Sequence, residues 1–98
     1  MVEIRRTRIF AEWLAALSDR NARARIEIRI DRLALGNAGD VKPVGGGVSE
    51  LRIAYGPGYR VYFVQRGDLL VILLCGGDKP SQDRDIGLAK ALARQLGE

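Results

Sequence analysis

The 98-residue sequence predicts an α+β fold, with an N-terminal helical hairpin packed on a twisted, mainly antiparallel sheet. Residues 51–79 indicate three strands rich in Val, Ile, Leu, Tyr and Phe, separated by breaks at 56–58 and 67–68. Glycine at these breaks supplies positive φ without steric cost, and proline presets φ for a turn. The flanking segments have apolar residues at helical spacing. We therefore expect about four strands, counting a short one at residues 2–4, and a C-terminal helix.

The first two helices differ in how clearly the sequence indicates them. An i, i+3, i+4, i+7 stripe predicts the first, formed by Phe10, Trp13, Leu14 and Leu17, with Trp13 as a core anchor. Residues 21–35 fit an alternating strand and also a helical stripe. Their length, Asn21 as a possible cap and Gly36 just past the end favour a helix. Ile28 falls outside its stripe, and contact with a partner is one explanation.

The remaining connections are predicted from their glycine, proline and charged residues. Residues 36–47 hold five glycines and Pro43, and we predict a flexible loop. A phosphate cradle is disfavoured, because no Gly-Lys-Ser/Thr follows and no strand precedes. After Lys79, a loop leads into a helix with acidic residues in its first turn and basic residues in its later turns.

The register of the three strands predicts which residues share a face. If Tyr55 faces Tyr59 across the first turn, Arg52 lies opposite Tyr62, and a two-residue second turn places Arg60 opposite Cys75. One face is then apolar and carries Leu51, Ile53, Tyr55, Tyr59, Val61 and Phe63. The other carries Arg52, Arg60 and Tyr62, with Lys79 nearby. A slip of one residue would move each arginine to the opposite face.

Composition limits the function classes. The length predicts one domain over residues 1–98. A single cysteine, no apolar run near the ~20 residues of a membrane span and no secretory signal favour a cytoplasmic protein. A net charge of +4 and a pI near 9.7 suit a polyanionic partner, either RNA or an acidic protein. With no histidine and no clustered carboxylates, we expect no metal and no other cofactor.

An ordered set of motifs resembles the RelE/ParE toxin superfamily, and most closely its HigB-like, phage-derived addiction module killer branch. The motifs are Lys42-Pro43-Val44, Glu50-Leu51-Arg52, Gly56-Pro57-Gly58-Tyr59-Arg60-Val61-Tyr62-Phe63 and Gly76-Gly77-Asp78-Lys79 with Gln82. No single motif is diagnostic, but the set at these spacings is fairly specific and covers nearly the whole chain. The resemblance implies a RelE-like fold and the toxin of a type II toxin-antitoxin module. It also implies a cognate antitoxin, commonly of helix-turn-helix type, and endonuclease action on ribosome-bound mRNA.

Cleavage of RNA by the neighbouring 2′-hydroxyl requires a base, stabilisation of charge on phosphorus and an acid. Without histidine or metal, cationic side chains must supply the electrostatic part. Arginine matches phosphate oxygens with a rigid fork, and a lysine near arginines can transfer a proton. The residues available at one end of the sheet are Arg52, Arg60 and Lys79.

The resemblance places Arg60 on the arginine of the family's Gly-Tyr-Arg strand, Arg52 near a lysine of the preceding strand and Lys79 near the arginine after the last strand. We predict these three as catalytic residues. Weaker candidates for RNA binding are Lys42, Tyr62 as a base-stacking ring, Asp78 and Gln82. A tyrosine that some members carry later has no counterpart here, since Asp85 or Ile86 occupies that region.

Two alternatives stay open at the level of sequence. ParE-like members poison DNA gyrase without cleaving RNA and share the fold and basic charge. A degenerate toxin would only bind its antitoxin. The arginines could also be ordinary surface residues paired with Glu50 or Asp78.

Overall fold

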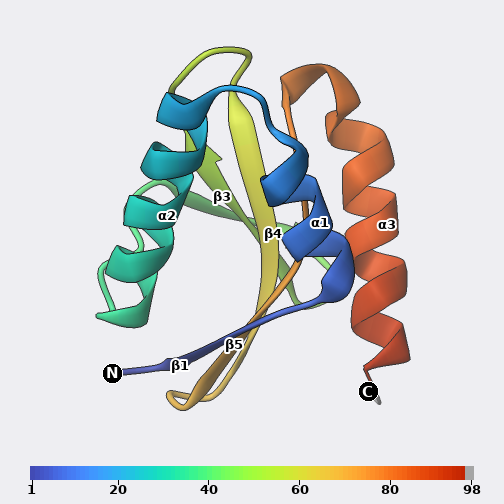
Figure 1. The fold of residues 1–98 in the computed structure, drawn as a ribbon. Helices are drawn as coiled ribbons and strands as arrows, with labels where there is room; N and C mark the ends of the chain where they lie inside the picture. Colours follow the sequence, from blue (N-terminus) through green and yellow to red (C-terminus); the bar gives the residue numbers. More distant parts are fainter. Residues whose placement is uncertain (97–98) are drawn as a thin grey trace.

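The computed structural model describes residues 1–96 and confirms the α+β class (Figure 1). The elements in chain order are β1 (Glu3–Arg6), α1 (Arg8–Ala16), α2 (Arg20–Ala34), β2 (Val41–Gly45), β3 (Val48–Ile53), β4 (Tyr59–Arg66), β5 (Leu70–Gly77), the 3-10 helix η1 (Lys79–Ser81) and α3 (Gln82–Gln95). The sheet has five strands in the order β1-β5-β4-β3-β2, with β1 parallel to β5 and the other pairs antiparallel. This architecture is consistent with a RelE-like fold.

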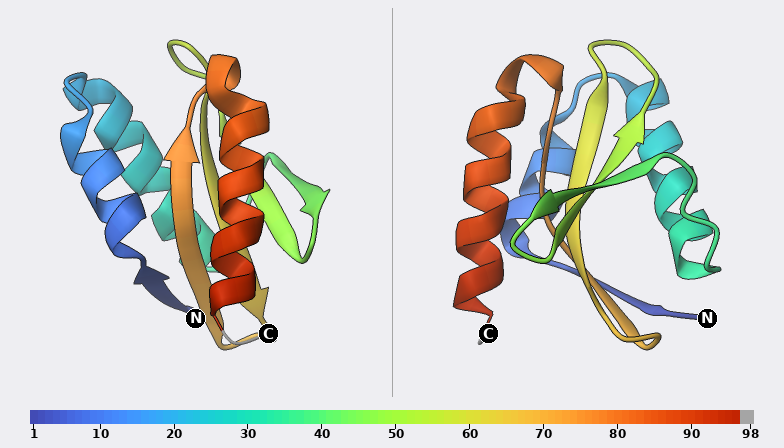
Figure 2. Two further views of the ribbon diagram at one scale, coloured as in Figure 1. Left: turned by 90° about the vertical axis from the view of Figure 1, so that its right-hand side faces the viewer. Right: turned by 180° about the vertical axis from the view of Figure 1, so that it is seen from behind.

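The helices form two layers around the sheet. The α1–α2 hairpin lies on one face and α3 on the other (Figures 1 and 2). Each face has its own apolar core, because side chains alternate along the strands. The hairpin side is built on Phe10, Ile26, Leu51, Val61 and Leu73, among others. The α3 side is centred on Val48, Tyr62, Leu74, Cys75 and Ala89. None of the helices in residues 1–96 combines the length and apolar character needed to span a membrane.

Two sequence predictions need correction in the N-terminal half. The α2 helix forms as predicted, but its cap is Asp19, whose side chain accepts hydrogen bonds from the backbone N–H groups of Asn21 and Ala22. Asn21, predicted as the cap, lies inside the helix. The strand β2 occupies part of the predicted loop 36–47 and adds a fifth strand to the expected four. Its pairing with β3 explains this, since Lys42 lies opposite Glu50 and Val41 opposite Leu51.

The first hairpin is longer than predicted, yet its faces are as predicted. Ile53 pairs with Tyr59 and Arg52 with Arg60, which leaves a five-residue connection in place of three residues. The observed register differs from the prediction by two residues. Because the side-chain period is two, each residue keeps its predicted face.

The second hairpin contains two compensating irregularities. Arg66 pairs with Leu70, so the turn is one residue longer than predicted, and Phe63 lies opposite Leu73. This slip would reverse the faces along β5. A bulge between Tyr62 and Phe63 restores them, so that Tyr62 pairs with Cys75 and Arg60 with Gly77, in place of the predicted Cys75.

Gly76 and Gly77 at the end of β5 let helices approach the sheet closely. A Cβ added at Gly76 would lie 2.3 Å from the Trp13 ring, and one at Gly77 would lie 1.7 Å from Asp85 Oδ2. Trp13 is therefore a packed anchor, in contact with the rings of Phe10 and Tyr59. The two glycines fix the heights of α1 and α3 above the end of β5.

We predict that Gly76→Ala destabilises the protein by about 1–3 kcal/mol, because the indole must move to admit the methyl group. The matched control is Gly87→Ala on α3, where an added Cβ meets nothing within 4 Å. The control is expected to be neutral or to stabilise by up to about 1 kcal/mol. Urea unfolding curves measure both values. Equal stabilities of the two variants would contradict this account of the packing.

Candidate functional site

Three predicted basic residues meet at one end of the sheet, around the connection between β3 and β4. Arg52 and Arg60 are directly opposite each other on neighbouring strands. A Cβ added at Gly58 would lie 3.2 Å from Arg60 Nη1 and 3.5 Å from Lys79 Cβ, which places the lysine beside the same turn. Gly58 also has φ +83°, so this approach favours glycine for both backbone and space.

A pocket opens at this end of the sheet. It is lined by Asp40, Arg52, Ile53, Ala54, Gly58, Tyr59 and Arg60, with a volume of about 330 Å³. That volume is at the lower end of the roughly 300–1,000 Å³ typical of ligand clefts. The pocket is therefore small and is lined by two of the three predicted catalytic residues.

Arg60 is held almost completely inside the protein. Its side chain is 11% exposed, Nη1 donates to the carbonyl of Gly58 at 2.8 Å and Nε lies 3.5 Å from Glu50 Oε2. The Nε atom makes no hydrogen bond within the described chain, and Nη2 donates to none of the described residues. The guanidinium is thus fixed in position, with one nitrogen left for a ligand oxygen in the pocket.

Arg52 and Lys79 are more open. Arg52 donates from Nε and Nη2 to Asp40 Oδ1, at 3.2 and 2.9 Å, and its side chain is 39% exposed. An exposed ion pair of this kind contributes little to the free energy of unfolding. Asp40 therefore orients Arg52 but does not hold it tightly. Lys79 begins η1, is exposed and makes no ion pair within residues 1–96.

Behind the arginines lies a fully buried carboxylate. Glu50 has no exposed surface, and its Oε2 accepts hydrogen bonds from Tyr62 Oη at 3.1 Å and Gln82 Nε2 at 2.8 Å. Its Oε1 has no partner among the described residues. A buried charge of this kind needs pairing, and Arg60 is the cation that supplies it. Glu50 thus joins β3, β4 and α3 directly beneath the site.

The four residues predicted to bind RNA are placed differently from one another. Tyr62 is completely buried, so its ring is not accessible and the predicted stacking role is wrong for this structure. Gln82 is half-buried and donates to Glu50. Asp78 caps η1, where it accepts from the backbone N–H of Ser81. Lys42 is exposed on β2 and lies in the same cross-strand row as Glu50, next to the row of Arg52.

Asp85 lies in the region where the family resemblance leaves the late tyrosine without a counterpart. It is 6% exposed, sits over Gly77 and accepts a hydrogen bond from Ser81 Oγ. Asp85 therefore lines a different pocket from Arg52 and Arg60, one that it shares with Trp13 and Ser81. Ile86, the other residue of that region, packs in the apolar core under α3.

Sequence reasoning missed the burial of Glu50 and Asp85. Glu50 lies on the same strand face as Arg52, two residues away, and Tyr62 is opposite Glu50. A sequence prediction that paired Glu50 with Tyr62 would therefore have revealed their contact. For Asp85 the signal was weaker, because an acidic residue in the first turn of a helix is ordinarily explained by the helix dipole.

The geometry defines a class of site. Arg52 and Arg60 line a small pocket, Lys79 lies beside the Gly58 turn, and the guanidinium of Arg60 is held against the buried carboxylate of Glu50. Preorganised cations of this kind bind and stabilise a phosphate or another anion. The geometry therefore defines a small pocket with two arginines in its lining, on a scaffold consistent with a RelE-like fold.

Comparison with known proteins gives the family. The model of the family described as phage derived protein Gp49-like (DUF891) matches residues 12–94, so the chain belongs to this family, which is that of the addiction-module killer, RelE-like toxins. The chain is also similar to an uncharacterized protein of Haemophilus influenzae (strain ATCC 51907 / DSM 11121 / KW20 / Rd). The two are 52% identical over 96 residues, which cover 98% of the chain and 97% of the relative.

We predict that Tyr62→Phe flattens the loss of stability at high pH. Burial, then the charge and hydrogen bond of Glu50, raise the pKa of the Tyr62 hydroxyl above its ordinary 10. The unfolded chain therefore loses this proton at a lower pH than the folded chain. The stability due to neutral Tyr62 is complete below about pH 10 and is lost as pH rises toward the folded value, by up to about 1.4 kcal/mol per pH unit.

The measurement is the free energy of unfolding in urea between pH 8 and pH 11, for wild type and variant. Burial, followed by the charge of Asp85, raises the pKa of the Cys75 thiol to about 12, and this second group titrates in both proteins. The difference between the two curves therefore isolates Tyr62. Parallel curves above pH 10 would show that the hydroxyl is not held neutral by the fold.

Proposed function

We propose that the chain is the toxin of a type II toxin-antitoxin module and a metal-independent mRNA endonuclease of the HigB-like branch, acting on ribosome-bound message. The observation that carries the proposal is that Arg52 and Arg60 line one small pocket and that Lys79 lies beside the same turn between β3 and β4. Family membership supports the toxin class. A net charge of +4 is consistent with a polyanionic substrate.

The proposed mechanism divides the work among the three basic residues. Arg60, fixed by Glu50 and by the Gly58 carbonyl, binds the scissile phosphate and stabilises its developing charge. Arg52 holds a neighbouring phosphate and thereby sets the position of the strand. The 2′-hydroxyl attacks phosphorus and loses its proton to solvent water, while the bond from phosphorus to the 5′-oxygen breaks. Lys79, exposed and without an ion pair in the described chain, donates a proton to that leaving oxygen and regains one from water. Lys42 extends the same basic surface along the message.

A cognate antitoxin completes the proposal. We expect it to be encoded beside this chain and to be a helix-turn-helix protein. Its binding would hold the endonuclease inactive until the antitoxin is removed.

The test uses Lys79→Ala and Arg52→Ala, because both side chains are exposed enough to remove without unfolding the protein. Arg60→Ala is a poorer test, since it would leave the Glu50 carboxylate buried without its cation. We expect induction of the wild-type chain in bacteria to arrest growth and to produce new 5′ ends within translated regions of transcripts. Each variant should lower cleavage by about 10²-fold or more, which is typical of losing an electrostatic stabiliser.

The matched control is Arg94→Ala, which removes an exposed arginine from the far end of α3. It should leave cleavage and arrest unchanged. Arrest without new RNA ends would favour gyrase as the target, to be checked by DNA cleavage. No arrest by well-folded wild-type protein would favour a toxin that only binds its antitoxin.

A further inference from the structure

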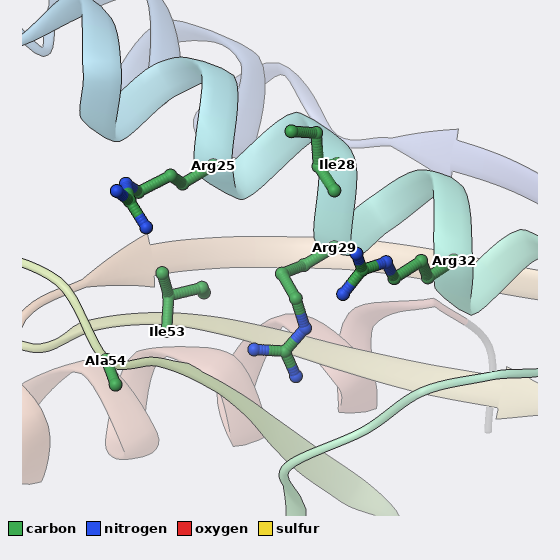
Figure 3. A pocket seen from close by; sticks show the side chains of 6 residues that line it. All are labelled: Arg25, Ile28, Arg29, Arg32, Ile53 and Ala54. Atoms are coloured by element: carbon green, nitrogen blue, oxygen red, sulfur yellow. The ribbon is translucent and has the colours of Figure 1, made fainter.

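A second basic surface lies beside the pocket of Arg52 and Arg60, in a groove between α2 and the end of β3. The groove has a volume of about 250 Å³ and is lined by Arg25, Ile28, Arg29, Arg32, Ile53 and Ala54 (Figure 3). Three of the six lining residues are arginines and the other three are aliphatic. No carboxylate lines this groove.

The groove continues onto the solvent-facing side of α2. Arg25, Ile28, Arg32 and Leu35 recur at i, i+3, i+7 and i+10, which places them along one side of the helix. All four are exposed, Ile28 by 50% and Leu35 by 68%. No carboxylate of residues 1–96 forms an ion pair with the two arginines of this pattern, and the pattern includes Ile28, whose place the core stripe of α2 does not explain.

The arginines of the groove keep their positive charge uncompensated. Arg29 crosses the groove and donates to the backbone carbonyls of Arg52, Ala38 and Asp40, at 2.6, 3.0 and 3.4 Å (Figure 3). Arg25 lies over the Tyr55 ring, 4.6 Å from its centroid. Neither contact neutralises a guanidinium, and Arg32 makes no side-chain ion pair in the described chain.

We propose that this groove is the docking site for an acidic, aliphatic-bearing segment of a protein partner. Carboxylates would pair with Arg25 and Arg32, and aliphatic side chains would cover Ile28 and Leu35. From Arg25 to Leu35 the helix advances about 15 Å, a span matched by about three turns of a partner helix.

Protein is favoured over RNA as the occupant by the chemistry of the surface. Single-stranded RNA is recognised by stacking on aromatic rings together with contacts to phosphate. The groove presents aliphatic side chains where RNA would need rings, and Tyr55 is covered by Arg25. Exposed aliphatic groups between arginines are better matched by a partner's apolar side chains.

The groove lies close enough to the pocket of Arg52 and Arg60 for a docked segment to affect that pocket. Ile53 and Ala54 line both this groove and the pocket of Arg52 and Arg60. A segment that fills the groove therefore ends at the rim of that pocket, where its carboxylates compete for the cations. This inhibitory consequence rests on the proposed function, whereas the docking does not.

The experiment selects binders from a displayed library of random 16-residue peptides against the purified chain. Three variants are then compared with wild type by fluorescence anisotropy of the enriched peptides: Arg25→Glu/Arg32→Glu, Ile28→Ser, and the matched control Arg84→Glu/Arg94→Glu, which makes the same charge change on exposed positions of α3. We expect enriched peptides to be acidic with interspersed Leu, Ile or Val. Their affinity should fall at least tenfold in the α2 reversal and several-fold in Ile28→Ser, and by less than twofold in the control.

Two results would overturn the proposal. One is a failed selection, in which no peptide is enriched or the enriched peptides are neutral or basic. Enriched peptides that bind the α2 reversal and the α3 reversal equally well would have the same meaning. The other is a 12-nucleotide single-stranded RNA that loses affinity in the α2 reversal and not in the control, which would make the groove part of an RNA path. Circular dichroism verifies that each variant is folded. Peptide binding is independent of cleavage, so loss of the endonuclease activity alone would count only against the proposed function.

Discussion

The structure depends most on how it accommodates the buried carboxylate of Glu50. This group has no exposed surface, and three side chains from two other elements contact it: Arg60 and Tyr62 on β4, and Gln82 at the start of α3. Removing a single partner from such a cluster commonly costs about 3–5 kcal/mol, because the remaining charge stays buried. The constraint that stabilises the centre of the sheet therefore also fixes Arg60 at the rim of the pocket.

A second constraint acts from the other side of the sheet. Arg29 on α2 donates to three backbone carbonyls in β3 and the connection before β2, and one of them belongs to Arg52. The backbone that carries Arg52 is thus tied to the helical hairpin, while the backbone that carries Arg60 is tied to α3 through Glu50. The two arginines are positioned by opposite layers of the fold and meet across β3 and β4. A segment bound along α2 would lie beside one of these two connections.

The sequence predicted faces more reliably than registers. The two-residue error in the first hairpin and the paired errors in the second left Arg52, Arg60 and Tyr62 on their predicted face, because hydrophobic alternation determines the face and turn length determines the register. The bulge between Tyr62 and Phe63 could not be predicted, because neither the alternation nor the turn residues indicate it. The ring of Tyr62 was expected to be accessible and is buried, because α3 packs on its face of the sheet.

At several positions the tertiary surroundings determined the observed structure more than the local sequence did. Asn21 and Asp19 are both good caps, and only the path of the chain selects Asp19. Five glycines concealed β2, which forms because β3 offers it an edge. Charged residues are ordinarily exposed, so the complete burial of Glu50 required knowledge of its three partners. The resemblance placed Arg52, Arg60 and Lys79 together, but the carboxylate behind them became evident only in three dimensions.

The most direct test of this account is a double-mutant cycle on the free energy of unfolding, with Glu50→Gln, Arg60→Gln and the double variant. Each single change leaves one buried charge without its partner, whereas the double change removes both charges at similar volume. We predict that the double variant is at least as stable as either single variant, with a coupling of about 1–3 kcal/mol. Additive losses would contradict the claim that this pair holds the arginine of the site.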